Sequence, residues 1–483
     1  MKKITLYLLV LVSISSFSQQ EKTISIEKNY NNWGWENVYV AKNKYISLVV
    51  VPEAAGRILE YNLGDVPSLW VNPKLLGKSF GTSDEVKMNE WRNFGGYRLV
   101  PLPIENSSID KNGNKSNRWP PPVVIGDAPY QVSVGENSEG KKTIEVQSGV
   151  QELPVPFYYG KEKKFLYPDK IEEEIQYARS LYIEPNSSLV YINHTLKNVG
   201  EETIKKGLMI SSQHVSWSDS KLQDGHNFSA FIPFSEDLKL PSGEQFEISA
   251  TPQQRWNYID RNRFKIDKNN PEHIKKYFNI GDNWKGEVAP GIYEVEYEYN
   301  TMAGLHIISS KSWICYVNKI TNTAFVKIME PYDAAKEYDH GINMAIFCSG
   351  LETGYIETEV KTPLYTLQSK ESFTYKEIQG AAKIETSPAL DVNLTGVITK
   401  KLHFNKETKS LEGSYGVFIE GQAVLILKNS NGKIVEEVIL EEVNPLKVLQ
   451  LRQKISVDKS VKVIDIVVRG SKSENHVLDS LKI

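Results

Sequence analysis

A segment near the middle of the chain, "GLMISSQHVSWSD", places Gln213, His214 and Trp217 within five positions. Histidine ionises near neutral pH and can act as a general acid or base, glutamine binds hydroxyl groups, and tryptophan stacks on sugar rings. Because side chains alternate along a strand, His214 would share a face with Leu208 and Ile210, and Gln213 would lie on the opposite face with Trp217. We interpret the segment as a site with His214 as its catalytic or binding group. The alternative is a polar strand end.

Carboxylates that could complete an acid–base pair follow later in the chain. Tyr355, Glu357 and Glu359 share one face of a predicted strand, and Glu330 begins the acidic stretch "EPYDAAKEYDH". Two carboxylates side by side on a strand are usually solvated. In a cleft, however, burial and mutual repulsion raise a pKa and make one of them a useful base. Spacing alone does not select a pair among these glutamates.

A third group of polar and aromatic residues surrounds a glycine pair, Gly95 and Gly96, in "WRNFGGYRLVPLPIE" and the following "RWPPPVVIGDAPY". Glycine permits positive φ or a close approach of the backbone to a ligand, while Arg and Asn donate hydrogen bonds to hydroxyl groups. The alternative is a tight hairpin with surface salt bridges. The substrate-binding candidates are Trp91, Arg92, Asn93, Arg98, Trp119, Arg179, Gln213 and Trp217. His194, a lone histidine among apolar neighbours, is interpreted as structural or exposed rather than catalytic.

Alternation of apolar and polar residues dominates the chain, as in "KYISLVVVP", "TIEVQSGV" and "YEVEYEYN". Many short strands with little helix predict an all-β sandwich or barrel. All nine tryptophans lie between Trp33 and Trp313, and after about Gln379 the strands become short and simple, with a hairpin signal at Asn431-Gly432. We therefore expect a functional body over 20–378 and an accessory immunoglobulin-like sandwich over 379–483.

The first 19 residues resemble a secretory signal peptide, with a basic "MKK" and the short apolar run "ITLYLLVLVSISSF". We expect an exported protein, periplasmic or secreted, with no membrane association after removal of the signal. The net charge of -3 and the absence of a basic block argue against a nucleic-acid partner. Cys315 and Cys348 are either two buried thiols or one disulfide. We expect no cofactor and no metal, since zinc-type cysteine spacing and phosphate-binding glycine loops do not occur.

The order of several segments resembles galactose mutarotase-like (aldose 1-epimerase-like) proteins, and most closely an exported bacterial branch of that superfamily. The segments are "VVVPEAAGRILEYNLG", "LVYINHTLKNVGEETIKKGLMISSQHVSW", "GYIETEVKTPLYTLQSKESFTYKE" and the glycine-pair segment, over residues 35 to 378. The resemblance implies a large curved antiparallel β-sandwich whose concave face binds a mono- or oligosaccharide. It also implies anomer interconversion, with His214 as acid and Glu357 as base; Glu359 and Glu330 are the alternative bases.

The chain departs from the family pattern at one position of the site. The first-half histidine of mutarotases has no counterpart, and Arg92, Asn93 and Arg98 stand there instead. Guanidinium groups pair with carboxylates, so these residues would suit an acidic sugar such as a uronate. Two other functions stay open: a non-catalytic carbohydrate-binding protein, and a polysaccharide lyase or glycosidase on the same scaffold. Burial of His214 in the core would favour the binding protein.

Overall fold

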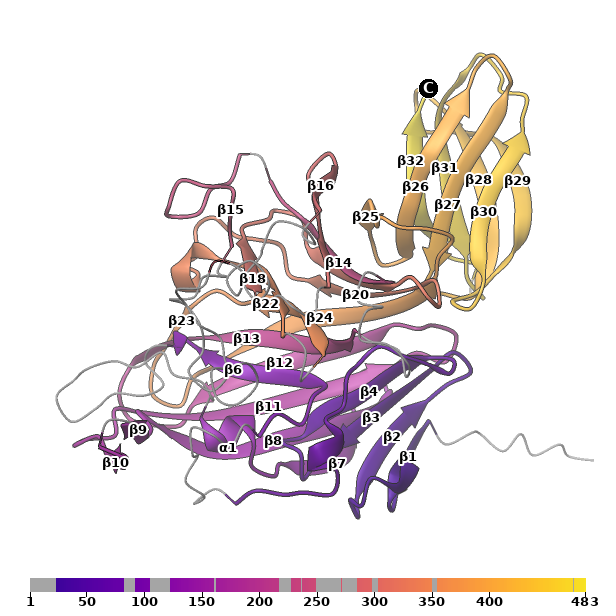
Figure 1. Cartoon of the computed structure of the whole chain (residues 1–483). Coiled ribbons are helices and arrows are strands. Elements are labelled where there is room, and N and C mark those ends of the chain that lie inside the picture. Colours follow the sequence, from indigo (N-terminus) through magenta and orange to yellow (C-terminus); the bar gives the residue numbers. More distant parts are fainter. Residues whose placement is uncertain are drawn as a thin grey trace, which may run out of the picture.

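The computed structural model describes residues 23–81, 92–104, 122–159, 162–216, 227–235, 237–248, 271, 285–297, 303–349, 354–471 and 473–483. Within these ranges the chain is almost entirely β, and the strands pair antiparallel (Figure 1). The all-β prediction is therefore confirmed. The proposed signal peptide lies outside the described residues. In the described part, no helix is both long enough and apolar enough to cross a membrane.

Two large sheets form the main body. The ten-stranded sheet runs, in spatial order, β16 (Gly286–Ala289), β17 (Ile292–Glu296), β14 (Phe228–Pro233), β19 (Trp313–Asn318), β20 (Thr323–Met329), β24 (Ser372–Lys383), β12 (Val190–Asn198), β11 (Glu173–Ile183), β8 (Lys142–Leu153) and β7 (Gln131–Glu136). The seven-stranded sheet runs β15 (Phe246–Ile248), β18 (Ala303–Ile307), β21 (Met344–Cys348), β22 (Tyr355–Lys361), β13 (Ile204–Val215) and β23 (Tyr365–Leu367), with β6 (Tyr97–Leu102) also paired to β13.

The apolar core lies between these sheets. Leu208 and Ile210 of β13 and Ile356 of β22 meet Tyr177 and Tyr316 of the larger sheet in one buried cluster. Each fully buried side chain of this size contributes roughly 1.5–3 kcal/mol through removal of apolar surface from water. Alternating residues of the same strands point away from the core, so the faces predicted from the sequence for 208–214 and 355–359 are those observed.

A five-stranded sheet in the first third of the chain packs against this body: β1 (Ile24–Glu27), β2 (Val38–Lys42), β3 (Ile46–Val51), β4 (Arg57–Leu63) and β5 (Val66–Pro67). The chain that leaves it runs beside the end of β13, where Trp70 N donates to Gln213 O at 2.8 Å. Gly95 and Gly96 have φ of 89° and 64°. A Cβ there would lie 2.2 Å from Trp70 O and 2.3 Å from Ile58 O, so both glycines serve close packing of backbone on backbone.

Shorter elements complete the body. Strands β9 (Phe157–Tyr159) and β10 (Lys164–Leu166) form a ribbon, and the single α-helical turn in the described ranges is α1 (Val123–Gly126). Three 3-10 segments are found at Tyr30–Asn32, Pro73–Leu75 and Asp339–Gly341. Cys315 of β19 and Cys348 of β21 are both buried thiols outside any disulfide, which decides between the two alternatives.

The chain leaves the ten-stranded sheet after Lys383 and forms a second, smaller sandwich (Figure 1). One of its sheets runs β25 (Asp391–Val392), β26 (Gly396–Asn405), β27 (Ser410–Val417) and β30 (Val448–Lys454); the other runs β29 (Ile434–Val443), β28 (Gly421–Asn429), β31 (Val461–Arg469) and β32 (Asn475–Lys482). The expected hairpin at Asn431-Gly432 joins β28 to β29. The sandwich has its own apolar core, and Ser188 N joins it to the main body by donating to Phe418 O at 2.8 Å.

Candidate functional site

His214 lies on the core face of β13. One ring nitrogen, Nδ1, is 3.2 Å from the carbonyl oxygen of Ser68, and the other, Nε2, is 2.9 Å from the hydroxyl of Thr358. Because a carbonyl only accepts, Nδ1 carries the proton and Nε2 accepts from Thr358. The ring also stacks on Tyr316 of the opposite sheet, with centroids 4.3 Å apart. His214 is thus a neutral histidine whose two nitrogens both have partners inside the sandwich. This burial is the outcome that favours a non-catalytic carbohydrate-binding protein over catalysis by His214.

The predicted pair of His214 and Glu357 does not form. Gln213, not His214, stands opposite Glu357 in the β13–β22 register, and His214 stands opposite Ile356. Successive residues of a strand point to opposite faces, so the sheet separates the imidazole from the carboxylate. Paired action of His214 and Glu357 on one sugar is therefore a wrong prediction, because the acid–base argument fixed residue types but not the face of the strand.

Burial of His214 should make the stability of the protein depend on pH. Burial, and to a smaller degree the charge of Lys327, lowers the pKa of His214 to about 3. In the unfolded chain its pKa is about 6.5, so the unfolded state binds the proton first and the stabilisation is lost as pH falls from about 6.5 towards 3. We expect the free energy of unfolding to fall over this range, and to fall less in His214→Gln.

Denaturant titrations at several pH values, with the exposed His476→Gln as control, check this expectation. The ring protons of His214 in an NMR pH titration give a second readout that does not depend on the variant folding. A ring that titrates near its ordinary value would contradict the buried, neutral assignment.

The opposite face of the same strands carries a buried polar cluster. The amide nitrogen Nε2 of Gln213 donates to Oε1 of Glu357 at 2.7 Å. On the same face, Ser211 stands opposite both Glu359 of β22 and Arg98 of β6. The exposed fractions are 0 % for Gln213, 2 % for Arg98, 5 % for Glu357 and 8 % for Glu359. Four strand-borne polar side chains are therefore held together, away from bulk water.

The two glutamates of the cluster differ in their readiness to ionise. Burial raises the pKa of Glu357, but the hydrogen bond from Gln213 and the charge of Arg98 oppose that rise. Burial raises the pKa of Glu359 to about 8, and the neighbouring charge of Glu357 adds to the effect. Ionising both of two adjacent carboxyl groups costs free energy because the two negative charges repel. Near neutral pH Glu357 therefore holds the charge and Glu359 the proton.

Arginines extend the cluster away from β22. Arg57 donates to Oδ1 of Asn93 at 3.1 Å and lies 3.5 Å from a carboxylate oxygen of Asp127. The charges of Arg57, Arg92 and Arg98 all act on Asp127, whose pKa is nevertheless raised, first of all by burial. Among the described residues, the side-chain oxygen of Gln213 and the side-chain nitrogen of Asn93 are buried without a hydrogen-bond partner. Buried polar atoms are nearly always paired in proteins, so these two atoms each have an unused capacity for a hydrogen bond to a polar ligand.

A second polar network lies behind the cluster, between the two sheets. Glu377 of β24 bonds Nε2 of His194 at 3.0 Å and also accepts from Tyr97. Lys327 of β20 reaches across and donates to the carbonyl oxygens of Ile210 and Thr358 at 3.1 and 2.9 Å. Burial raises the pKa of Glu377, but the bond from His194 and the charge of Lys327 outweigh it and hold this pKa at about 2. The structural role predicted for His194 agrees with this position.

The remaining predicted residues are distributed as follows. Arg92, Asn93 and Arg98 join the cluster with Gln213, Glu357 and Glu359. Arg179 lies in the core, where its guanidinium donates to Gly56 O and sits 5.2 Å from the ring centroid of Tyr97. Glu330 follows β20 and accepts from the backbone nitrogen of Lys376 at 3.0 Å, so it belongs to the other sheet. Trp91, Trp119 and Trp217 lie outside the described residues.

Sequence reasoning did not select Arg57, Asp127 or Ser211. Two of them stand inside segments that were already singled out, "AAGRIL" and "IGDAPY", and Ser211 shares a strand face with Gln213. A search for polar residues on the Gln213 face would have found Ser211; Arg57 and Asp127 come from distant segments joined only by the fold. In the part of the chain that the structure describes, no group of three or more His, Cys, Asp or Glu is arranged to hold a metal ion.

No family model matches the chain. No curated protein matches it either. Several solved structures match the chain. A galactose mutarotase-like protein from Clostridium acetobutylicum shares 13 % identity, covers 74 % of this chain and 98 % of its own, and has a TM-score of 0.40. A galactose mutarotase related enzyme from Lactobacillus acidophilus shares 11 % identity over 74 % of this chain and 100 % of its own, with a TM-score of 0.41.

A further galactose mutarotase-like protein, from Lactobacillus casei, shares 10 % identity over 71 % of this chain and 99 % of its own, with a TM-score of 0.40. All three neighbours are named as galactose mutarotase-like or galactose mutarotase related proteins.

Proposed function

We propose that this protein is an exported carbohydrate-active enzyme that binds an acidic sugar at the Arg98–Gln213–Glu357 cluster and interconverts its anomers. The observation that carries the proposal is the carboxyl pair. Glu357 and Glu359 lie side by side, buried, with environments that leave one ionised and the other protonated. Pairs of titratable groups whose pKa values are pushed apart are the usual signature of a general base with a general acid.

The pair suits ring opening of a sugar. The anomeric hydroxyl and the ring oxygen are bonded to the same carbon, so an acid and a base placed side by side can reach both. The carboxylate of Glu357 accepts the hydroxyl proton while the carboxyl of Glu359 donates its proton to the ring oxygen. The bond between the anomeric carbon and the ring oxygen breaks, and a carbonyl forms. Rotation and the reverse transfers then close the other anomer and restore both side chains.

The charge of the cluster supports an acidic substrate. The guanidinium groups of Arg57, Arg92 and Arg98 act on the carboxyl group of Asp127, and that of Arg98 also acts on Glu357. Arginine is the side chain best shaped to bind a carboxylate. A uronate is the sugar class that carries one.

The pH dependence of the reaction tests the roles of the two glutamates. Since burial and the charge of Glu357 raise the pKa of Glu359 to about 8, Glu359 holds its proton below that pH and loses it above. We expect the rate to fall above about pH 8. A rate profile over the neutral and alkaline range checks this, with Glu359→Gln as the comparison. The same alkaline fall in that variant would show that Glu359 is not the acid.

The experiment that tests the function is a substrate panel: glucose, galactose, glucuronate and galacturonate, with short neutral and uronic oligosaccharides. NMR reads anomer exchange and binding, and product analysis reads bond cleavage. The proposal expects exchange of a uronate faster than the buffer rate. Binding without exchange would leave a sugar-binding protein, cleavage products would indicate a lyase or glycosidase, and neither binding nor turnover would refute the proposal.

A further inference from the structure

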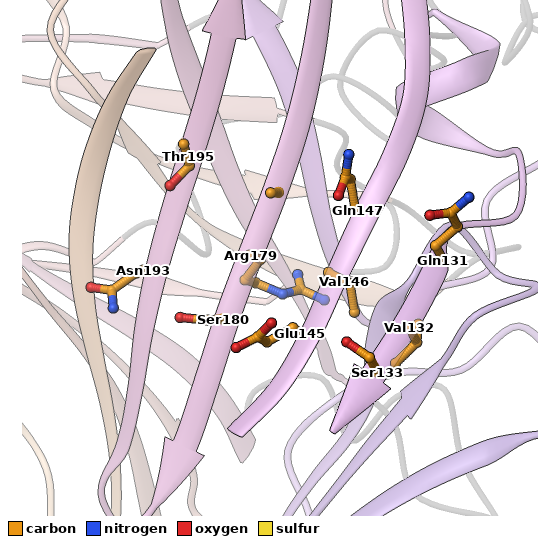
Figure 2. A pocket seen from close by; sticks show the side chains of 11 residues that line it. Gln131, Val132, Ser133, Glu145, Val146, Gln147, Arg179, Ser180, Asn193 and Thr195 are labelled. Carbon is orange, nitrogen blue, oxygen red and sulfur yellow. The ribbon is translucent and has the colours of Figure 1, made fainter. Parts of the chain in front are cut away.

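The outer face of the ten-stranded sheet carries a hollow. The carboxyl pair of Glu357 and Glu359 lies on the other large sheet. The hollow has a volume of about 340 Å³ and crosses strands β7, β8, β11 and β12 (Figure 2). That volume is within the range of small-ligand pockets, roughly 300–1,000 Å³. Neighbouring strands are about 4.8 Å apart, so the three spacings from β7 to β12 give a length of about 14 Å. The hollow can therefore hold a ligand longer than one sugar ring.

The strand register aligns hydrogen-bonding side chains across this hollow. One row runs through Gln131, Gln147 and Thr195, and the next through Glu145, Ser180 and Asn193. These side chains point away from the core, because their neighbours in sequence, such as Val146 and Leu181, are buried in it. Amide, hydroxyl and carboxylate groups in two parallel rows provide donors and acceptors for the paired hydroxyls of a sugar chain.

An aromatic pair stands at one end of the rows. Tyr182 and Tyr191 lie opposite each other on β11 and β12, on the same face as Ser180 and Asn193, with ring centroids 4.8 Å apart and planes 7° apart. Aromatic rings beside polar groups are typical of surfaces that bind sugars, whose faces are apolar and whose rims are polar.

The charges around the hollow do not favour an anionic ligand. The ammonium group of Lys141 lies over the rings of Tyr182 and Tyr191. It is already paired with Glu139 and Glu184. Of the residues that line the hollow, Arg179 is the only cation, and its guanidinium turns into the core towards Gly56 O and the Tyr97 ring. Glu145 remains exposed on the hollow side and would repel an anion. This is the opposite of the arginine-rich cluster on the seven-stranded sheet.

We propose that the hollow across β7, β8, β11 and β12 is a second carbohydrate site, which binds a neutral oligosaccharide and takes no part in catalysis. Such a site would hold the protein on a glycan while the carboxyl pair acts on acidic sugars. Two linked sites raise the effective concentration of substrate without any new contact at the catalytic site.

Calorimetry with neutral tetrasaccharides (cellotetraose, xylotetraose, maltotetraose and galactotetraose) tests the site, with a galacturonate tetrasaccharide as the anionic comparison. Gln147→Ala removes an amide group that can donate and accept hydrogen bonds in the hollow, and Ser180→Trp fills the hollow with a bulky side chain. Gln450→Ala, an exposed glutamine on strand β30, is the matched control. Glu357→Gln reports on the other site.

We expect at least one neutral tetrasaccharide to bind, and both hollow variants to weaken that binding by about tenfold or more. Gln450→Ala and Glu357→Gln should leave it unchanged. The proposal is wrong if no neutral tetrasaccharide binds, if binding survives Ser180→Trp, or if the galacturonate chain binds the hollow better than the neutral chains. Loss of binding in Glu357→Gln alone would assign the ligand to the carboxyl pair and overturn the second site, while leaving the proposed function standing.

Discussion

Glu357→Gln is expected to slow anomer exchange by about 10²–10⁴-fold, the usual contribution of a positioned general base. The substitution keeps the size of the side chain, and the Gln213 amide nitrogen can still donate to the remaining oxygen. What is lost is the negative charge that accepts the proton. Because the effect is on proton transfer, the loss should appear mainly in kcat, with a smaller change in KM.

Glu330→Gln is the matched control, since Glu330 was an alternative candidate for the base from the sequence and lies on the other sheet. Its rate should equal that of the wild type. The folded structure of Glu357→Gln should be checked by circular dichroism and denaturant unfolding, because the variant removes a charge that acts on the buried Arg98 and is therefore expected to lower the stability. An undiminished rate in Glu357→Gln, on a substrate that the wild type turns over, would exclude Glu357 as the base.

Glu377→Gln is expected to destabilise the protein by about 3–5 kcal/mol, the usual cost of leaving a buried charge without its compensating charge. Glu377 is 1 % exposed and its carboxylate offsets the charge of Lys327, which lies between the sheets. Burial already lowers the pKa of Lys327 to about 8, and the charge of Glu377 is the strongest of the opposing effects. Without it, the ammonium group must either stay buried without compensation or lose its proton.

Denaturant unfolding and the thermal midpoint measure this loss, with the exposed Glu412→Gln as a control that should not differ from the wild type. A second variant, Glu377→Gln with Lys327→Met, removes both charges and should recover part of the stability. If Glu377→Gln were as stable as the wild type, the charge of Glu377 would make no net contribution to the stability of the network between the sheets.

Much of the site could be found from local pattern. Alternation in 208–214 and 355–359 predicted the strands and the face that each residue occupies, because side-chain direction in a strand has a period of two that no tertiary contact alters. The same pattern put Gln213 on the face opposite His214 and placed Glu357 with Glu359. Glycine at 95 and 96 indicated either positive φ or a close approach of the backbone to a ligand. Both residues have positive φ, and the close approach is to the backbone of Trp70 and Ile58.

Only the tertiary structure decided which face of β13 packs into the apolar core and what stands across from it. The histidine looked like the reactive group because its chemistry is the most versatile, yet packing on Tyr316 makes it a neutral core residue. The pairing of β13 with β22 and β6 brought Gln213, Glu357 and Arg98 together from positions more than a hundred residues apart. Register between distant strands is set by the whole core, and so are the burial and neighbouring charges that separate the pKa values of two adjacent glutamates. For this protein, the strand face that each residue occupies could be predicted from the local sequence, whereas the ionisation of His214 and of the two glutamates depends on the fold.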